Sequence, residues 1–347
     1  MSATSSRKRS SKPTLADIAE QVGVSIATVS KVVNGKSDVS KETRDRVQTA
    51  IEAVSYDGRA SSSRSSKLID LVFQRMGDPW SLQLLRGMQL CAREHKLSVV
   101  VTELGLDQRY PNDDWVDNII EHHPVGAVMV FSDLKPKQAK RLISRSIPVI
   151  LLDPSGEINQ EAFSVQCDNW TGGLQATRHL IKLGHKRIAY ISGNDGLLCS
   201  RARYDGYATA LAEAGIPLDP SFYRQGHFWP DTGLQQTLEL FKLNEPPTAI
   251  FAGNDQQAMG VYEAARQLGI RIPDDLSVIG FDDVPTSQFM TPPLTTIHQP
   301  LIEMAQQAAQ LAIDIRNGKI DPLGDVPRRI ILPTSLVVRE STAPPNS

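Results

Sequence analysis

The first regular pattern along the chain is a short stripe of apolar positions with helical spacing. The stripe repeats at i, i+3, i+4 and i+7 and consists of Leu15, Ile18, Ala19 and Val22. Such a stripe predicts a short amphipathic helix. Thr14 and Asp17 have the spacing of a capping box at its start. Gly23 ends the helix because glycine readily adopts the left-handed conformation.

Two further helices are predicted directly afterwards. Ser25 is the N-cap of a helix over 26–33, which stops at Asn34-Gly35. Ser40 starts a third helix, whose apolar face consists of Val47, Ala50, Ile51 and Val54. Two short helices joined by a glycine-containing turn, with a third completing a small core, predict a helix-turn-helix unit.

From residue 68 onward, β-rich runs alternate with helical patterns. The expected strands are 68–73, 98–104, 126–131, 148–153, 187–193, 248–253 and 276–282. The expected helices include 82–94, 172–183, 204–214 and 256–268. This alternation implies parallel sheets with helices on both faces. The runs form two groups around 166–170, so we predict an α/β fold with two Rossmann-like lobes and a ligand cleft outside the strand C-termini.

Length and composition narrow the class of protein. The 347 residues provide for two or three domains, and no run approaches the roughly 20 apolar residues of a membrane helix. Residues 1–12 are basic and Ser-rich without an apolar run behind them, unlike a secretory signal. The three cysteines form no CxxC pair, which argues against a disulfide framework or zinc site and favours the cytoplasm.

The charge is divided unevenly along the chain. Residues 1–67 hold 12 Lys and Arg against 7 Asp and Glu, which leaves 25 against 32 for the remainder. A basic head on an acidic body indicates that the head meets a polyanion.

A helix-turn-helix unit places its second helix in the major groove of DNA. Thr28 and Ser30 are suited to phosphate contacts. Ile26 and Ala27 would contact thymine methyl groups, and Lys31 would reach guanine acceptors. A three-helix bundle for protein contacts is the alternative, which the basic charge disfavours. The candidate DNA-binding residues are Thr14, Ser25, Ile26, Ala27, Thr28, Ser30, Lys31 and Asn34.

Several motifs of the N-terminal unit resemble the DNA-binding signature of the lactose-repressor (LacI/GalR) family. They are TLADIA (14–19), GVS (23–25), TVSKVVNG (28–35) and VS (39–40). Motifs of the body resemble that family's effector-binding domain, itself similar to periplasmic sugar-binding proteins. They are LGHKRI (183–188), RARYDGY (201–207), AGND (252–255), VIGFDD (278–283), PPLTTI (292–297) and LVVR (336–339). The resemblance implies a homodimer that binds a pseudo-palindromic operator.

The linker over 57–67 departs from the family pattern. The family has a proline where Gly58 stands and, near Ser65, a leucine that wedges into the minor groove from a hinge helix. Six of these eleven residues are Ser or Gly, which disfavour a helix, and serine cannot act as an apolar wedge. We therefore predict DNA binding without the hinge wedge.

Candidate effector-binding residues lie at the ends of the predicted strands. Asp153, Asn254 and Asp282 follow apolar runs, and Arg203 is expected to open a helix after 188–193. By resemblance, Arg203 and Asp282 bind effector in many relatives. The full set is Trp80, Asp153, Arg203, Phe228, Asn254, Asp282 and Gln299. Carboxylates and a guanidinium suit adjacent sugar hydroxyls, and an aromatic face suits the C–H surface of a ring.

Purely structural roles are the alternative for several of these residues. Asp153 and Asp282 could cap turns, and Trp80 or Phe228 could belong to the core. His122-His123 is expected to be an exposed helix end, and His185 resembles a structural residue of the family.

The favoured function is a transcription regulator that represses carbohydrate-utilisation genes and is released from, or recruited to, its operator by a sugar. No cofactor, metal or catalytic motif is expected, so the chain is not predicted to be an enzyme. A purine or nucleoside effector is the alternative. A glycoside hydrolase with Asp153 and Asp282 as acid and base, or a transport-binding protein, would leave the helix-turn-helix unexplained.

These patterns divide the chain into five parts. A basic tail (1–12), the helix-turn-helix (13–56) and the linker (57–67) precede the effector-binding domain (68–341) and a tail (342–347). One lobe is expected over 68–167 and 297–328, and the other over 168–296 and 329–341.

Overall fold

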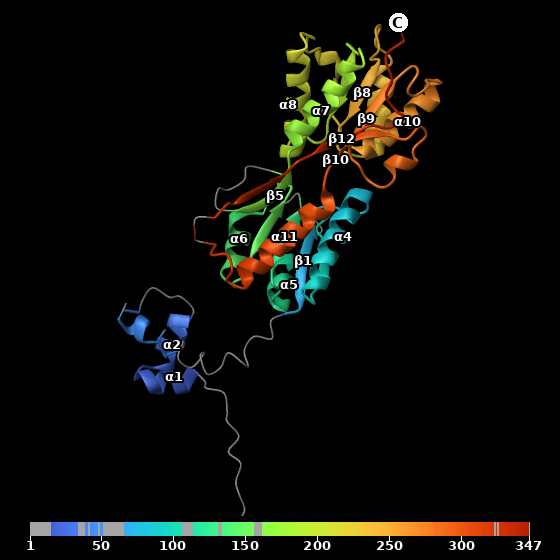
Figure 1. Cartoon of the computed structure of the whole chain (residues 1–347). Coiled ribbons are helices and arrows are strands. Elements are labelled where there is room, and N and C mark those ends of the chain that lie inside the picture. Colours follow the sequence, from blue (N-terminus) through green and yellow to red (C-terminus); the bar gives the residue numbers. More distant parts are fainter. Residues whose placement is uncertain are drawn as a thin grey trace, which may run out of the picture. The chain divides into compact units, whose positions relative to one another are not determined.

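The computed structural model describes residues 15–33, 39–40, 42–47, 49–50, 66–105, 114–130, 134–155, 162–322, 324 and 326–346. The chain divides into two compact units, Met1–Ser66 and Lys67–Ser347 (Figure 1).

The N-terminal unit is helical, as predicted. Helices α1 (Leu15–Val22) and α2 (Ile26–Val33) are joined at Gly23, whose φ of 70° is left-handed, and residues 42–47 and 49–50 are helical. The Ser25 Oγ accepts a hydrogen bond from the Thr28 amide at 3.1 Å, which confirms the N-cap. One small core joins the three helical segments through Ile18, Ala19, Val22, Val29, Val32, Val47 and Ala50. Thr14, Asn34 and most of the linker lie outside the described residues.

The first lobe of the second unit contains a six-stranded parallel sheet. Its strands, in spatial order, are β11 (Arg329–Leu332), β5 (Phe163–Cys167), β4 (Val149–Leu152), β3 (Ala127–Val130), β1 (Leu68–Phe73) and β2 (Ser98–Glu103). Its helices are α4 (Pro79–Glu94), α5 (Asp114–His122), α6 (Pro136–Ile143) and α11 (Leu301–Arg316). Helices α4 and α11 share one core with one face of the sheet, and α5 and α6 share another with the opposite face.

The second lobe repeats this plan. Its strands, in spatial order, are β12 (Ser335–Val337), β10 (Thr295–His298), β9 (Ser277–Asp282), β8 (Ala249–Ala252), β6 (Ile188–Ile191) and β7 (Tyr223–Arg224). Its helices are α7 (Asn169–Lys182), α8 (Leu198–Glu213), α9 (Pro230–Leu240) and α10 (Asp255–Leu268), with short 3-10 turns at Pro220–Phe222 and Ser287–Phe289. Only the edge strand β12 runs antiparallel to its neighbour among the described pairs. The α/β fold with two mainly parallel sheets is thus as predicted.

The chain crosses between the lobes three times: from β5 to α7, from β10 to α11 and from β11 to β12. The expected boundary after residue 328 is wrong, because Arg329–Leu332 pair in parallel with Ser164–Cys167 of the first lobe. The third crossing therefore lies between Leu332 and Ser335.

The C-terminal residues are fixed to the second lobe rather than forming a free tail. The Ser341 Oγ donates to the Val278 carbonyl at 2.6 Å, and the Asn346 side chain donates to the Asp274 carbonyl at 2.7 Å. His185 lies 2.9 Å from the Ala343 carbonyl oxygen through Nε2 and 2.9 Å from the Thr248 Oγ1 through Nδ1. His185 thus joins the C-terminal segment to the sheet, which accords with a structural role.

His122 is not simply an exposed helix end. Its Nε2 lies 2.9 Å and 3.1 Å from the two carboxylate oxygens of Asp70, which is fully buried on β1. Desolvation raises the pKa of the Asp70 carboxyl, and the contact with His122 opposes this effect. The helical pattern of α5 could not reveal this partner on a distant strand.

Candidate functional site

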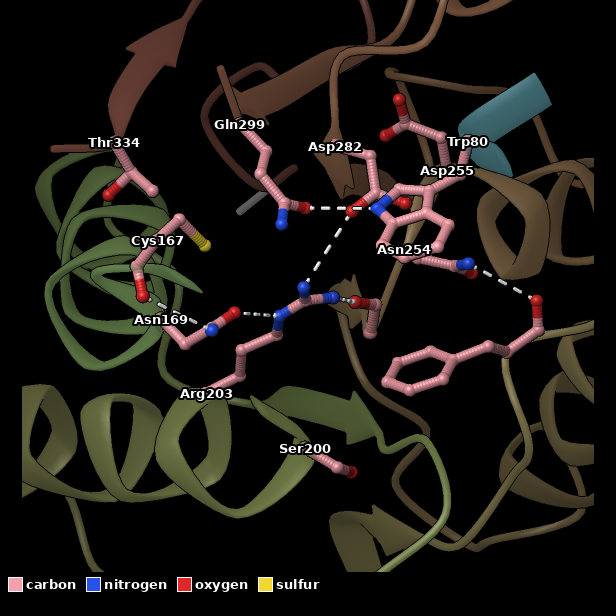
Figure 2. A network of polar contacts seen from close by, with 12 residues as sticks. Trp80, Cys167, Asn169, Ser200, Arg203, Asn254, Asp255, Asp282, Gln299 and Thr334 are labelled. Carbon is pink, nitrogen blue, oxygen red and sulfur yellow. Dashed lines mark hydrogen bonds and ion pairs between the residues drawn. The ribbon is translucent and has the colours of Figure 1, made fainter. Parts of the chain in front are cut away.

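Four of the predicted effector-binding residues lie at the carboxyl ends of parallel strands or beside them. Asp153 follows β4, Asn254 follows β8, and Asp282 is the last residue of β9. Arg203 approaches the same place from α8 as its sixth residue, because the helix begins at Leu198 and not at Arg203 as expected. Figure 2 shows the side chains that meet around Arg203.

Arg203 is the centre of the polar network. Its side chain is 3% exposed; Nε donates to the Asn169 Oδ1 at 2.8 Å and Nη1 donates to the Gly253 carbonyl at 2.7 Å. Its guanidinium carbon lies 3.6 Å from the centre of the Phe281 ring. The remaining nitrogen, Nη2, lies 3.7 Å from the Asp282 Oδ1, which is an ion pair but too long for a strong hydrogen bond.

Two buried carboxylates flank this guanidinium. Within the described part of the chain, the Asp153 Oδ2 and the Asp282 Oδ1 are buried without a hydrogen-bond partner. Burial raises the pKa of the Asp153 carboxyl to about 6, against the opposing effects of Arg203 and a hydrogen bond with Asn169. Burial also raises the pKa of the Asp282 carboxyl well above its usual range, although Arg203 lowers it. Each carboxylate therefore keeps one buried oxygen without a hydrogen-bond donor, and for each the cost of burying the charge outweighs its stabilisation by Arg203.

The remaining predicted residues complete the same network. The Trp80 Nε1 donates to the Gln299 Oε1 at 3.3 Å, and the backbone N–H of Gln299 donates to the Asp282 carbonyl at 3.3 Å. The Asn254 side chain donates to the Phe228 carbonyl at 3.2 Å while its Oδ1 caps α10. The Phe228 ring centre lies 5.5 Å from the Arg203 guanidinium. The structure thus brings all seven predicted residues together.

Backbone strain is concentrated at this site. Asp153, Phe228, Asp282 and Asp283 all have positive φ angles, of 48°, 67°, 110° and 56°. Each such conformation in a residue other than glycine costs about 1–3 kcal/mol and persists only where the surroundings enforce it. The fold therefore holds these side chains in positions that relaxed loops would not give them.

Sequence reasoning missed several residues of the site. Asn169 orients Arg203 and is the first residue of α7, two positions after the end of β5, a strand absent from the predicted set. Asp255 accepts hydrogen bonds from the Val284 amide at 2.9 Å and from the Thr296 hydroxyl at 2.6 Å, so it fixes the loop after Asp282.

Both lobes contribute to the site. Trp80 and Asp153 come from the first lobe, and Arg203 and Asp282 from the second. A cavity of about 750 Å³ opens beside Asp153 and is lined from both lobes, which is within the usual size range of small-molecule sites. Of the seven predicted residues, Asp153 alone lines this cavity, and the other six lie outside its lining. Among the described residues, no group of three or more His, Cys, Asp or Glu side chains could hold a metal ion.

The exposed surface of α2 carries the candidate DNA-reading residues. Ile26 is 54% exposed, and Ala27 and Lys31 are also exposed, while Val29 and Val32 face the core. The hydroxyls of Ser25 and Thr28 lie 2.8 Å apart at the start of the helix, and Ser30 is half-buried. An exposed isoleucine at the first turn fits apolar contact with a base edge better than a place in the small core.

Comparisons with known proteins match both units. Residues 14–58 match the model of bacterial regulatory proteins of the lacI family, and residues 177–342 match the periplasmic binding protein-like domain. The HTH-type transcriptional repressor CytR of Escherichia coli (strain K12) is 32% identical over 340 residues, which cover 97% of this chain and 98% of that protein.

Solved structures match over nearly the same length. A complex of the transcriptional regulator CelR with cellobiose is 29% identical, with a TM-score of 0.72. The lac repressor dimer bound to operator and the anti-inducer ONPF is 28% identical, with a TM-score of 0.70. Each match covers 95% of this chain and 99% of the other. No helix in the described ranges is both long and apolar enough to span a membrane.

Proposed function

This chain belongs to the lacI family of bacterial regulatory proteins, and we propose that it is a repressor whose operator affinity is controlled by an uncharged, hydroxyl-rich effector. The effector occupies the cleft between the lobes and is a sugar. The site binds its ligand and does not catalyse a reaction, so this function requires no cofactor.

The pair of unsatisfied carboxylate oxygens carries this proposal. A buried acceptor without a donor costs about 1–3 kcal/mol, and the Asp153 Oδ2 of the first lobe and the Asp282 Oδ1 of the second lobe both stand in this condition. Adjacent hydroxyls of one ligand would donate to both oxygens and accept from the Arg203 Nη2. An anionic ligand fits less well, because the unpartnered atoms of Asp153 and Asp282 are carboxyl oxygens that seek donors, whereas an anion offers acceptors.

Control of DNA binding follows from the placement of these groups on both lobes. A ligand shifts an equilibrium only by its differential affinity for the two states. An effector held by Asp153 from one lobe and by Arg203 and Asp282 from the other binds the closed arrangement better than an open one.

A nucleoside is the second candidate for the effector. Two aromatic side chains, Trp80 and Phe228, and the side-chain amide of Gln299 belong to the same network. They could stack on a base and bond its edge while the carboxylates hold the ribose hydroxyls.

The DNA partner is proposed to be a pseudo-palindromic operator bound by a homodimer in the cytoplasm. The helix-turn-helix match and the operator-bound lac repressor dimer support this assignment, since two-fold protein symmetry is mirrored in the half-sites.

The test is a thermal-shift screen with ribose, cellobiose, cytidine and adenosine, each beside a phosphorylated analogue. A ligand that binds the folded state raises the melting temperature. We expect an uncharged compound to stabilise the wild type but neither Asp153→Asn nor Asp282→Asn, with the exposed Asp219→Asn as control. Stabilisation by the phosphorylated analogues alone would contradict the proposal, and a gel shift with the binding compound then tests control of the operator.

A further inference from the structure

A cationic and an aromatic side chain meet across the cleft beside the candidate site. The guanidinium carbon of Arg75, in the loop after β1 of the first lobe, lies 3.8 Å from the ring centre of Trp229, which precedes α9 of the second lobe. We infer that this pair, the Arg75–Trp229 latch, holds the lobes closed and gates access to the site. The gating role rests on the proposed function, whereas the closure does not.

The Arg75 side of the latch is anchored to the first lobe. The Gln74 side chain donates a hydrogen bond to the Gly105 carbonyl, and the Gly105 backbone N–H donates one to the Gln74 carbonyl, both at 2.9 Å. Three residues after Arg75, the Asp78 carboxylate accepts from the Ser81 amide at 2.7 Å and caps α4. Hydrogen bonds therefore fix the loop on both sides of Arg75, which restricts the position of its backbone.

The Trp229 side is equally fixed, through backbone groups. The Trp229 carbonyl accepts from the Thr232 amide at 3.2 Å and from the Thr232 hydroxyl at 2.9 Å, as the cap of α9. The preceding Phe228 carbonyl accepts from the Asn254 side chain. Because the indole ring takes no part in these bonds, its removal should leave the loop intact.

The two sides of the latch are adjacent to residues of the site. Phe228 directly precedes Trp229, and Trp80, in the first turn of α4, lies five residues after Arg75, so separation of the lobes would open the latch and the site together. A backbone hydrogen bond from the Leu198 amide to the Ser155 carbonyl, at 3.2 Å, also joins the lobes. A cation–π contact contributes about 0.5 kcal/mol when exposed and about 2 kcal/mol when desolvated. Loss of such a contact from the closed state would raise the ratio of open to closed molecules about 2- to 30-fold.

The experiment measures the lobe separation in the full chain without any ligand. Nitroxide labels on Gln89→Cys of α4 and Gln235→Cys of α9, both exposed, report the distance by pulsed electron paramagnetic resonance. The native cysteines are all buried. We expect Arg75→Ala and Trp229→Leu each to increase the open fraction about 2- to 30-fold.

Matched controls are Arg93→Ala, an exposed arginine of α4, and Phe289→Leu, a 79% exposed aromatic residue of the second lobe that does not line the cavity. Unchanged distances in both latch variants, or an equal increase in the controls, would overturn the inference. If the distances increase but no sugar or nucleoside binds the wild type, the latch stands and the proposed function fails.

Discussion

Replacement of Arg203 by alanine is the sharpest perturbation of the site. Arg203 is the cation that opposes the raised pKa values of both Asp153 and Asp282. Its removal would also leave the Gly253 carbonyl and the Asn169 Oδ1 without the donor that each has now. The variant therefore combines an unpaired buried charge with unsatisfied acceptors.

The expected cost is large because Arg203 and Asp282 are each only 3% exposed. Removal of one partner from a buried ion pair typically costs 3–5 kcal/mol. The surface pair Arg178 and Glu213 provides the contrast, with side chains 52% and 48% exposed. Exposed pairs contribute about 0–1 kcal/mol, so Arg178→Ala should be nearly neutral.

Urea denaturation of Arg203→Ala, Arg178→Ala and the wild type measures this difference in the free energy of unfolding. A double-mutant cycle then combines Arg203→Ala with Asp282→Asn. Asp282→Asn should recover part of the stability that Arg203→Ala loses, because it removes one of the buried carboxylates whose charge Arg203 balances. Operator binding by the folded fraction should persist, since the helix-turn-helix belongs to a separate compact unit, whereas the effector response should be lost. A cost below 1 kcal/mol for Arg203→Ala would refute the assignment of Arg203 as an essential counter-charge.

Three further predictions concern stability and DNA. Asp153 and Asp255 have pKa values raised by burial from 3.8 to about 6, so their contribution to the free energy of unfolding should be lost as pH rises from 3.8 through 6; an equal change of the urea midpoint between about pH 5 and pH 7.5 in the wild type and in Asp255→Asn would contradict this. Lys31→Ala should weaken specific operator binding by about 1–3 kcal/mol more than non-specific binding; equal losses in a gel shift would reduce Lys31 to a phosphate contact. Ser65→Leu should increase operator bending in a circular-permutation assay. Leu68 begins β1 and its carbonyl accepts from the Val125 amide, so a wild-type kink lost in Leu68→Ala would oppose the idea that no wedge exists.

The central strands could be predicted from the sequence because parallel strands covered on both faces are continuous apolar runs. The expected 68–73 coincides with β1, and the expected 248–253 extends β8 by one residue at each end. Edge strands lack this signal. In β11, Arg329 and Ile331 are exposed and alternate with less exposed residues because only one face of this edge strand is covered, so the strand is not a continuous apolar run and the position of the third crossing could not be predicted.

The site could be predicted only in part, for a similar reason. Asp153 and Asp282 stand at ends of recognisable strands, and the resemblance pointed to Arg203. Local patterns could not show which acceptors Arg203 satisfies or that Asn169 holds it. The start of α8 was misjudged because its N-cap is Leu197, which forms no side-chain capping bond and so leaves no capping signal in the sequence.

The three crossings between the lobes also set an order of assembly during synthesis. Each sheet receives an edge strand from the last residues of the chain, β11 in the first lobe and β12 in the second. The N-terminal unit, by contrast, is complete at Ser66. Because domains fold as units and the N-terminal one emerges first from the ribosome, this unit is available about 260 residues before either sheet receives its final strand. A nascent chain halted before Arg329 would contain the whole N-terminal unit, while the sheet of each lobe would still lack one edge strand.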